Sequence, residues 1–292
     1  MKHVKNIYFA LFCLLLSNYA DAQINPMNAQ LFQNQYLANP AKAGAETGAR
    51  LNLGYKNQWS SMPGNPHTSM VSYDARTNKV GLGLTVINQK DGLQIPTKVM
   101  GTYAYHLPLS GTNKFFHLGL SLGFFKGYIS TQDLVGDLGD QSVQNYNARE
   151  LVLDGDAGFA YTSERFGVEA VIYNLKSQLK NDLKNTVDNN TSYYAMAYSF
   201  PLADWKLQSK IAYRGIRNFT DIVDFGLNAQ TFDEKINFTA VYHTNKSVSA
   251  GVGYIYQKQW QILGLYTTAA TPINGYVNGT FEVGLKVNLQ KK

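Results

Sequence analysis

The feature that most constrains this chain is a repeated stretch of about ten residues in which apolar side chains alternate with small or polar ones. Examples run from Val80 to Val86, from Phe116 to Phe124 and from Phe281 to Val287. A period of two indicates a strand with one apolar face. Strands of about ten residues can cross a bilayer, whereas strands in soluble sheets are usually about five or six residues long. Only a closed barrel leaves no sheet edge in lipid, so the pattern predicts an all-β fold, a transmembrane antiparallel β-barrel.

The connections between strands support this topology. We predict about fourteen strands. Starting from the second strand, every other connection is short, and most of those between them, such as 89–96, 128–150 and 175–191, are longer. Short turns at one end and longer loops at the other are typical of outer-membrane barrels with periplasmic turns. The predicted strands span 49–58, 68–75, 79–88, 97–107, 115–127, 151–161, 166–174, 192–200, 205–213, 222–231, 235–244, 247–256, 259–268 and 279–288.

The N-terminal region divides into two segments. Residues 1–22 are predicted to be a signal peptide, with a basic start, a short apolar run and an A-x-A cleavage site at Ala20–Ala22, which makes Gln23 the mature N-terminus. The single cysteine, Cys13, would be removed with this peptide. Residues 23–48 lack alternation and contain prolines, so we expect an extended segment that lies in the periplasm or inserts into the lumen. Residues 49–292 are predicted to be the barrel.

Composition agrees with an integral barrel of the cell outer membrane. No run of about eighteen apolar residues follows the signal peptide, so no transmembrane helix is predicted. The mean hydropathy of −0.25 fits a barrel, because only every second strand residue meets lipid. The formal net charge is +6, but the basic residues are scattered, which disfavours nucleic acid as a partner. Lys126, Glu169, Lys210 and Arg214 are predicted to face the lumen, and composition leaves open whether the lumen is water-filled or plugged.

No catalytic or metal-binding motif is evident. His67, His106, His117 and His243 have no acid or nucleophile at a fixed spacing, and no Gly-x-Ser-x-Gly is present. Three aspartates of one long loop do not match the spacing of a calcium loop. The sequence therefore predicts a protein that is not an enzyme and that uses no cofactor and no metal. The three loop aspartates are Asp133, Asp137 and Asp140.

The segment after the signal peptide carries a recognisable motif. Residues 35–44 contain Gln35-Tyr36, Asn39-Pro40-Ala41 and Ala43-Gly44. This pattern resembles the opening "QY-x-x-NPA-x-AG" of the PorP/SprF family of type IX secretion system membrane proteins from Bacteroidetes. The resemblance continues along the chain in Gln58-Trp59, Gly64, Pro66, Thr68, Ser72, Asp74, Gly81-Leu82-Gly83, Asp91-Gly92, Asp156, Gly158, Tyr161 and Phe281 to Leu285. It is most specific between residues 35 and 92.

The resemblance implies a non-enzymatic outer-membrane barrel. Such a barrel assists type IX secretion, or anchors secreted cell-surface proteins such as gliding adhesins by binding their C-terminal domain. The implied partner is a secreted surface protein with that domain, and the sequence leaves open whether a periplasmic peptidoglycan-binding lipoprotein is bound as well. The alternative hypothesis is a diffusion porin or small-molecule transporter.

Six residues are candidates for partner binding. Gln58 and Asp74 are polar groups beside the predicted membrane boundary and need partners, for which we expect pairing between the first two strands before client docking. Trp59 is expected to be an interface anchor. The residues of the N-terminal motif are expected to fix that segment against the barrel, with an edge for periplasmic partners as the alternative. They are Tyr36, Asn39 and Pro40.

Overall fold

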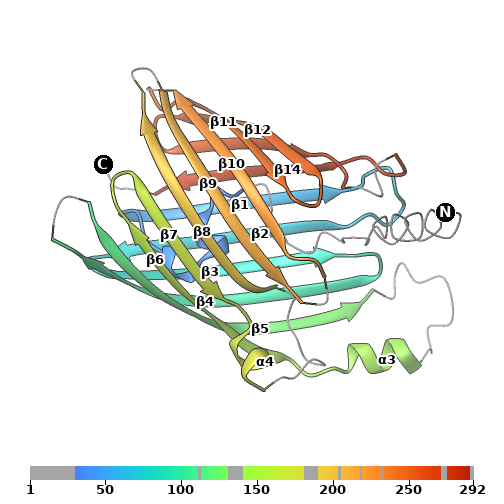
Figure 1. Ribbon diagram of the computed structural model, residues 1–292. Coiled ribbons are helices and arrows are strands. Elements are labelled where there is room, and N and C mark those ends of the chain that lie inside the picture. The colour runs from blue at the N-terminus through green and yellow to red at the C-terminus, as the bar shows by residue number, and fades with distance from the viewer. Residues whose placement is uncertain are drawn as a thin grey trace, which may run out of the picture.

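The computed structural model describes residues 30–110, 113–130, 141–180, 190–202, 205–217, 219–231, 233–270 and 275–289. The predicted signal peptide and the three loop aspartates lie outside these ranges. The described chain forms a closed barrel in which every strand is antiparallel to its two neighbours and β1 pairs with β14 (Figure 1). The prediction of a fourteen-strand antiparallel barrel is confirmed.

The strands are β1 (Gly48–Gln58), β2 (His67–Thr77), β3 (Val80–Lys90), β4 (Gln94–Pro108), β5 (Phe115–Ile129), β6 (Val152–Thr162), β7 (Phe166–Ile172), β8 (Asn190–Pro201), β9 (Trp205–Ile216), β10 (Ile222–Thr231), β11 (Ile236–His243), β12 (Ser247–Tyr256), β13 (Trp260–Thr267) and β14 (Thr280–Asn288). Most predicted bounds fall within two residues of these. The exceptions are β4, which begins three residues earlier than predicted, and β9, which ends three residues later.

The two ends of the barrel differ in their connections. The start of β1, the end of β14 and most of the short connections lie at one end, which we call the turn end. The opposite loop end carries the longer connections, including the helices α3 (Gln141–Asn147) and α4 (Leu175–Lys180). The predicted loop 89–96 is wrong. β3 and β4 continue into a tight turn at the loop end, in which Asp91 and Gln94 exchange two backbone hydrogen bonds of 2.8 and 3.1 Å.

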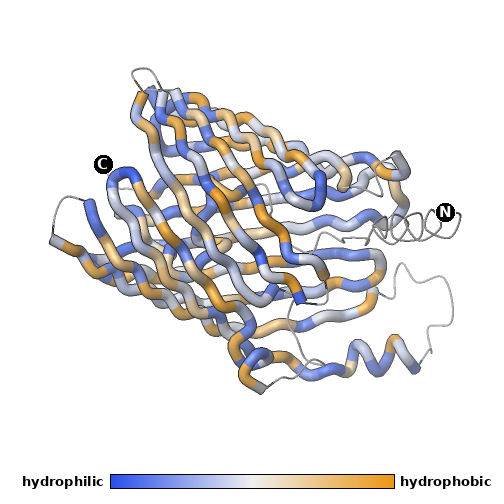
Figure 2. The backbone as a smooth tube through the Cα atoms, in the orientation of Figure 1, coloured by the Kyte–Doolittle hydropathy of each residue, from blue (hydrophilic) through white to orange (hydrophobic). Residues whose placement is uncertain are grey.

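Hydrophobic and hydrophilic residues alternate along the strands (Figure 2), and the exposed fractions show which of them face outward and which face the lumen. Leu82 is 57% exposed and Leu120 46%, both on the outer face. Charged side chains such as Glu169 and Lys210 are buried on the inner face. The inward placement of Lys126 is wrong, because it alternates in phase with the outward Phe124 and Tyr128 near the loop end. Among the described residues, no helix is long and apolar enough to cross a membrane.

The barrel wall is shorter at β7 than at the neighbouring strands β6 and β8. β7 pairs with β6 only over Ala157–Thr162, so the first five residues of β6 pair with β5 alone. The connection after β7 covers this edge, because Asp154 of β6 caps α4. The Asp154 carboxylate accepts hydrogen bonds from the backbone N–H of Lys176 (2.7 Å) and from the hydroxyl of Ser177 (2.6 Å). A carboxylate at this position satisfies N–H groups that the helix itself leaves unpaired.

Candidate functional site: a plug in the barrel lumen

The main feature of the lumen is residues 30–47, which lie inside the barrel and which we call the plug (Figure 1). The plug contains two short helical turns, α2 (Gln35–Ala38) and η1 (Pro40–Lys42). It reaches opposite parts of the wall: Gln33 donates a hydrogen bond to Thr239 of β11 (2.9 Å), and Asn34 donates one to Ser72 of β2 (3.1 Å). The part of the predicted 23–48 segment that the structure describes therefore occupies the lumen.

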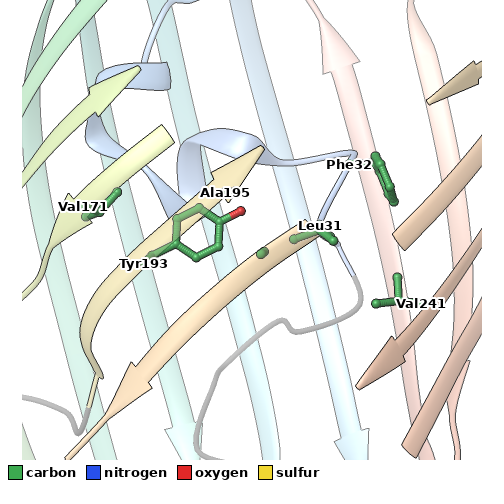
Figure 3. Close-up of a cluster of buried hydrophobic side chains, with 7 residues drawn as sticks. Leu31, Phe32, Val171, Tyr193, Ala195 and Val241 are labelled. Atoms are coloured by element: carbon green, nitrogen blue, oxygen red, sulfur yellow. The ribbon is translucent and has the colours of Figure 1, made fainter. Parts of the chain in front are cut away.

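An apolar cluster holds the first residues of the plug against strands β7, β8, β9 and β11. Leu31 and Phe32 are buried among inward side chains of β7, β8, β9 and β11 (Figure 3). Burying a side chain of this size contributes about 1.5–3 kcal/mol. The wall residues of the cluster are Val171, Tyr193, Ala195, Ala212 and Val241.

The Asn39-Pro40-Ala41 motif forms the tightest part of the plug. The Asn39 side chain caps η1 by accepting a hydrogen bond from the N–H of Ala41 (2.9 Å). Its amide group donates to the carbonyl of Phe159 and to the carboxylate of Glu169, both at 3.1 Å. Pro40 occupies the first position of η1, where the missing N–H costs nothing. One asparagine thus fixes the local turn and also ties it to β6 and β7.

Glycines in the wall make room for this turn. A Cβ atom at Gly119 of β5 would overlap the backbone of Pro40 and Ala41, and one at Gly158 of β6 would overlap the Asn39 side chain. On β3, a Cβ atom at Gly81 would likewise overlap the backbone of Ala43, and one at Gly83 would overlap the Tyr36 side chain. The wall is therefore shaped to the plug. The Gly81-Leu82-Gly83 and Asp156-x-Gly158 motifs owe their glycines to this close approach.

A network of ion pairs connects the plug to the wall at the turn end. Asp74 of β2 accepts a hydrogen bond from the backbone N–H of Gly44 (2.8 Å) and pairs with Arg50 of β1. Arg50 also binds Glu46 at 2.9 Å, and Glu46 lies 3.6 Å from Lys286 of β14. The predicted pairing of Asp74 with the first strand is present, and it also holds the plug.

A second buried pair lies beneath η1. Lys210 of β9 bonds Glu169 of β7 at 2.9 Å, and the same carboxylate accepts the hydrogen bond from Asn39. Both charged side chains are at most 5% exposed. Because an isolated buried charge is strongly unfavourable, these two groups depend on each other.

Two histidines at the turn end also contact the plug. His106 and His117 face each other on β4 and β5 with their Nδ1 atoms 2.7 Å apart. Nε2 of His106 lies 3.0 Å from the carbonyl oxygen of Ala43, and Nε2 of His117 lies 2.7 Å from the hydroxyl of Thr162. The pair therefore bridges the plug and three strands, a structural role.

His243 has partners that the sequence did not reveal. Its Nδ1 lies 2.6 Å from the Asp224 carboxylate, and its Nε2 lies 2.8 Å from the hydroxyl of Ser249. No fixed spacing along the chain marks these three residues, yet the fold brings them together. An Asp–His–Ser arrangement is the geometry that activates a serine nucleophile.

The surroundings of this triad favour a structural interpretation. Ser249 is fully buried, and its Oγ makes a second hydrogen bond, to the hydroxyl of Thr267 at 2.6 Å. Asp224 also pairs with Arg214 at 2.8 Å, which reduces its effect on the imidazole. We interpret the triad as part of a polar network that joins β9 to β13. In the described residues, no group of His, Cys, Asp and Glu could hold a metal ion.

The two longer loops attach to the barrel in different ways. In the β7–β8 connection, the Tyr173 hydroxyl donates to the Ala38 carbonyl of the plug (2.5 Å), and the Asn174 side chain donates to the Asn190 carbonyl (2.8 Å). This connection is therefore built into the wall. In the β5–β6 connection, by contrast, Asn147 at the end of α3 bonds the backbone of Ile129 at the tip of β5, and the Tyr146 hydroxyl donates to Gln94 at the tip of β4 (3.4 Å).

The six candidate partner-binding residues are mostly enclosed. Tyr36, Asn39, Pro40 and Asp74 are buried between plug and wall, and Gln58 is buried at the loop end of β1. Trp59 is half-buried, and its backbone N–H donates a hydrogen bond to the Gly279 carbonyl (3.1 Å). A direct role in partner binding stays a prediction for all six. Five of them become accessible only if the plug or its surroundings move.

Comparison with known proteins identifies the family. The sequence matches the family described as "Type IX secretion system membrane protein PorP/SprF" over residues 20–287, which is most of the chain. The chain belongs to the PorP/SprF family. The resemblance seen in the N-terminal motif is thereby confirmed, and this PorP/SprF protein is an outer-membrane β-barrel. No curated protein matches the sequence.

Solved structures share the barrel fold at low sequence identity. The monoaromatic hydrocarbon channel CymD is 12% identical, with a TM-score of 0.54 over 94% of this chain and 95% of CymD. A deltaS2 mutant of the monoaromatic hydrocarbon channel TodX is 11% identical, with a TM-score of 0.50 over 85% of this chain and 91% of TodX. These similarities concern the fold alone. In an outer-membrane barrel the short turns face the periplasm, so the turn end is periplasmic and the loop end extracellular.

Proposed function

We propose that this PorP/SprF barrel is a non-enzymatic anchor that assists type IX secretion. It holds secreted surface proteins, such as gliding adhesins, at the cell surface by binding their C-terminal domain. A periplasmic peptidoglycan-binding lipoprotein is the partner we propose for its turn end. The membership of the family supports the secretion role, and the plug supports binding rather than conduction.

The plug is the observation that carries this proposal. A water-filled lumen is what a diffusion porin needs. Here the plug makes hydrogen bonds to β2, β6, β7 and β11. It also buries the side chains of Leu31 and Phe32 against inward side chains of the wall. Glycines of the wall approach the plug so closely that a Cβ atom at these positions would overlap it, so the plug is packed as an integral part of the fold. A rigid, filled barrel can present loops without ordering a large surface on binding.

The β5–β6 connection is the candidate client contact at the extracellular end. It rises from the tip of β5, where Tyr128 is 46% exposed, and returns through Leu151, which is also 46% exposed. Arg149 stacks over the ring of Tyr146 at 4.5 Å. Exposed aromatic and aliphatic side chains next to an arginine are typical of interface centres.

The test is to replace residues 131–148 with a short Gly-Ser linker in the native membrane. Because the described part of this loop contacts the barrel at the tips of β4 and β5, we expect the variant to stay heat-modifiable while surface display of the client falls. The assay is protease shaving of whole cells followed by mass spectrometry. The matched control is Lys246→Gly in the β11–β12 turn at the same end, where φ is 65° and suits glycine.

Two outcomes would count against the proposal. Unchanged display of every surface protein after the loop replacement would exclude this loop as the contact. Unchanged display after deletion of the whole gene, together with altered uptake of small solutes, would favour the porin alternative. A tagged barrel that copurifies with no periplasmic lipoprotein would remove that partner.

A further inference from the structure

A small polar cavity lies between the plug and the wall near the turn end, and we call it the Lys42 cavity. Its volume is about 40 Å³. This is room for about three water molecules or for one carboxylate group. Water reaches the cavity from the periplasm, because Glu46 belongs to its lining and the Glu46 side chain is 70% exposed. The charged side chains of the lining are Lys42 and Glu46 of the plug and Arg50, Asp74 and Lys286 of the wall.

The three cations of this lining outnumber its two acids. Arg50 pairs with both Asp74 and Glu46. Lys286 lies 3.6 Å from the same Glu46 carboxylate. Lys42 is only 7% exposed, yet in the part of the chain that the structure describes its ammonium makes no hydrogen bond and no ion pair. A buried ammonium without a partner is unfavourable, so Lys42 is the group that calls for an anion.

The acids near Lys42 are already bonded to other groups. Glu169 and Glu46 attract the Lys42 ammonium, whereas Lys210 repels it. The Glu169 carboxylate bonds Lys210 and accepts the hydrogen bond from Asn39. The Glu46 carboxylate is held by the two wall cations of the cavity. Neither acid can turn to Lys42 without leaving another buried group unpaired, so the missing anion has to come from a ligand.

A second unpaired group narrows the chemistry of that ligand. Gln33 also lines the cavity, and its buried Oε1 accepts no hydrogen bond from any described residue. An ammonium only donates hydrogen bonds, whereas an amide oxygen only accepts them. The ligand should therefore carry an anionic group and an N–H close together, as the last residue of a peptide does. The small volume and the two acids of the lining disfavour phosphate, which is larger and more highly charged.

We propose that the Lys42 cavity binds the C-terminal carboxylate of a periplasmic peptide or protein. The Lys42 ammonium donates to the carboxylate, and Oε1 of Gln33 accepts from the N–H of the last residue. Hydrogen bonds between charged groups are short and strong, and capture of a C-terminal carboxylate is a recurring mode of peptide recognition. Because Lys42 belongs to the plug, a bound ligand also stabilises the plugged state of the barrel. The inference does not depend on the proposed client, which binds at the opposite end.

Calorimetric titration of the purified barrel in detergent tests the proposal, with tri-alanine, its C-terminal amide and acetate as probes. We expect tri-alanine to bind at least tenfold more tightly than the amide, which lacks the carboxylate. It should also bind at least tenfold more tightly than acetate, which lacks the N–H for Gln33. Lys42→Met keeps the bulk of the side chain without its charge and should weaken tri-alanine at least tenfold.

The matched control is Lys258→Met in the β12–β13 turn at the same end. The Lys258 side chain is 77% exposed and lies outside the cavity lining, so its loss should leave the affinity for tri-alanine unchanged. Acetate that binds as tightly as tri-alanine would assign the site to free small carboxylates and overturn the peptide terminus. Inorganic phosphate that binds more tightly than tri-alanine would overturn the carboxylate.

Urea unfolding in lipid vesicles separates ligand binding from a structural role of Lys42. Lys42→Met removes a buried charge that lacks a partner, so without ligand the variant should be at least as stable as the parent protein. Saturating tri-alanine should raise the urea midpoint of the parent protein and leave that of Lys42→Met unchanged. A lower midpoint of Lys42→Met without ligand would show that the ammonium is already stabilised within the barrel. That result, equal binding of tri-alanine and its amide, or no binding of either, would overturn the proposal.

Discussion

The glycine under the plug motif allows a direct test of how the barrel is closed. In Gly119→Ala, the added Cβ would overlap the backbone of Pro40 and Ala41. This backbone cannot yield easily, because Pro40 restricts its own φ and the Asn39 amide is bonded to Phe159 and Glu169. Forcing one extra carbon into a packed site costs about 1–3 kcal/mol. We expect the upper half of that range, since the obstructing atoms are main-chain atoms.

The loss of stability in Gly119→Ala cannot exceed the free energy with which the plug docks in the barrel. If the steric overlap cost more than that, the plug would leave its site and the overlap would be relieved. The assay is therefore double: urea unfolding in lipid vesicles, and conductance in planar bilayers. We expect Gly119→Ala to lower the free energy of unfolding by about 2–3 kcal/mol and to show current steps that the parent protein lacks.

The matched control is Gly264→Ala on β13. A Cβ at Gly264 meets nothing within 4 Å, and the residue is exposed on the outer face. Its free energy of unfolding should change by no more than about 0.5 kcal/mol, as for an ordinary surface substitution, without current steps. Equal stability and equal conductance of the two variants would refute the argument that η1 is locked against β5.

Three further predictions concern the wall. Leu82→Arg and Leu120→Arg should each lower the stability in vesicles by about 2–4 kcal/mol, because both side chains face lipid; unchanged urea midpoints would mean that the faces are assigned wrongly. The parent protein should not react with a fluorophosphonate probe, and labelling that disappears in Ser249→Ala would instead establish an active serine. Glu169→Gln should cost about 3–5 kcal/mol by leaving a buried ammonium unpaired, and adding Lys210→Met should recover most of it in the same unfolding assay.

The strands could be predicted from sequence because each carries its own signal. Alternation is local, so β10 and β12 were placed without any knowledge of their neighbours. The errors in the predicted strands and faces occur where something other than alternation determines the structure. Pro96 suggested a loop, yet it lies in β4 opposite Gly127, while the real turn is marked by Gly92 with a φ of 60°. Lys126 was assigned to the lumen by its charge, but near the strand end the outer face is also wet.

The lumenal contacts could not be predicted in the same way. Asn39 meets Phe159 and Glu169 across more than a hundred residues, and nothing in the local sequence marks that pairing. The triad is a similar case. The register of β10 and β11 sets Asp224 directly opposite His243, and Ser249 reaches the same ring from β12. Such contacts follow from strand register and not from spacing along the chain.

The plug also explains why the inner wall combines glycines with charges. A fourteen-strand barrel filled with water would have no need of glycines at Gly119 and Gly158, since larger side chains could extend freely into the lumen. Here small residues lie where the plug backbone approaches, and ion pairs such as Glu169 with Lys210 lie where its polar groups need partners. The Tyr173 hydroxyl, bonded to Ala38, connects this interior to the β7–β8 connection at the cell surface. The interior, in other words, is built around its own N-terminal segment, an arrangement that suits a barrel which holds other proteins more than one which passes solutes.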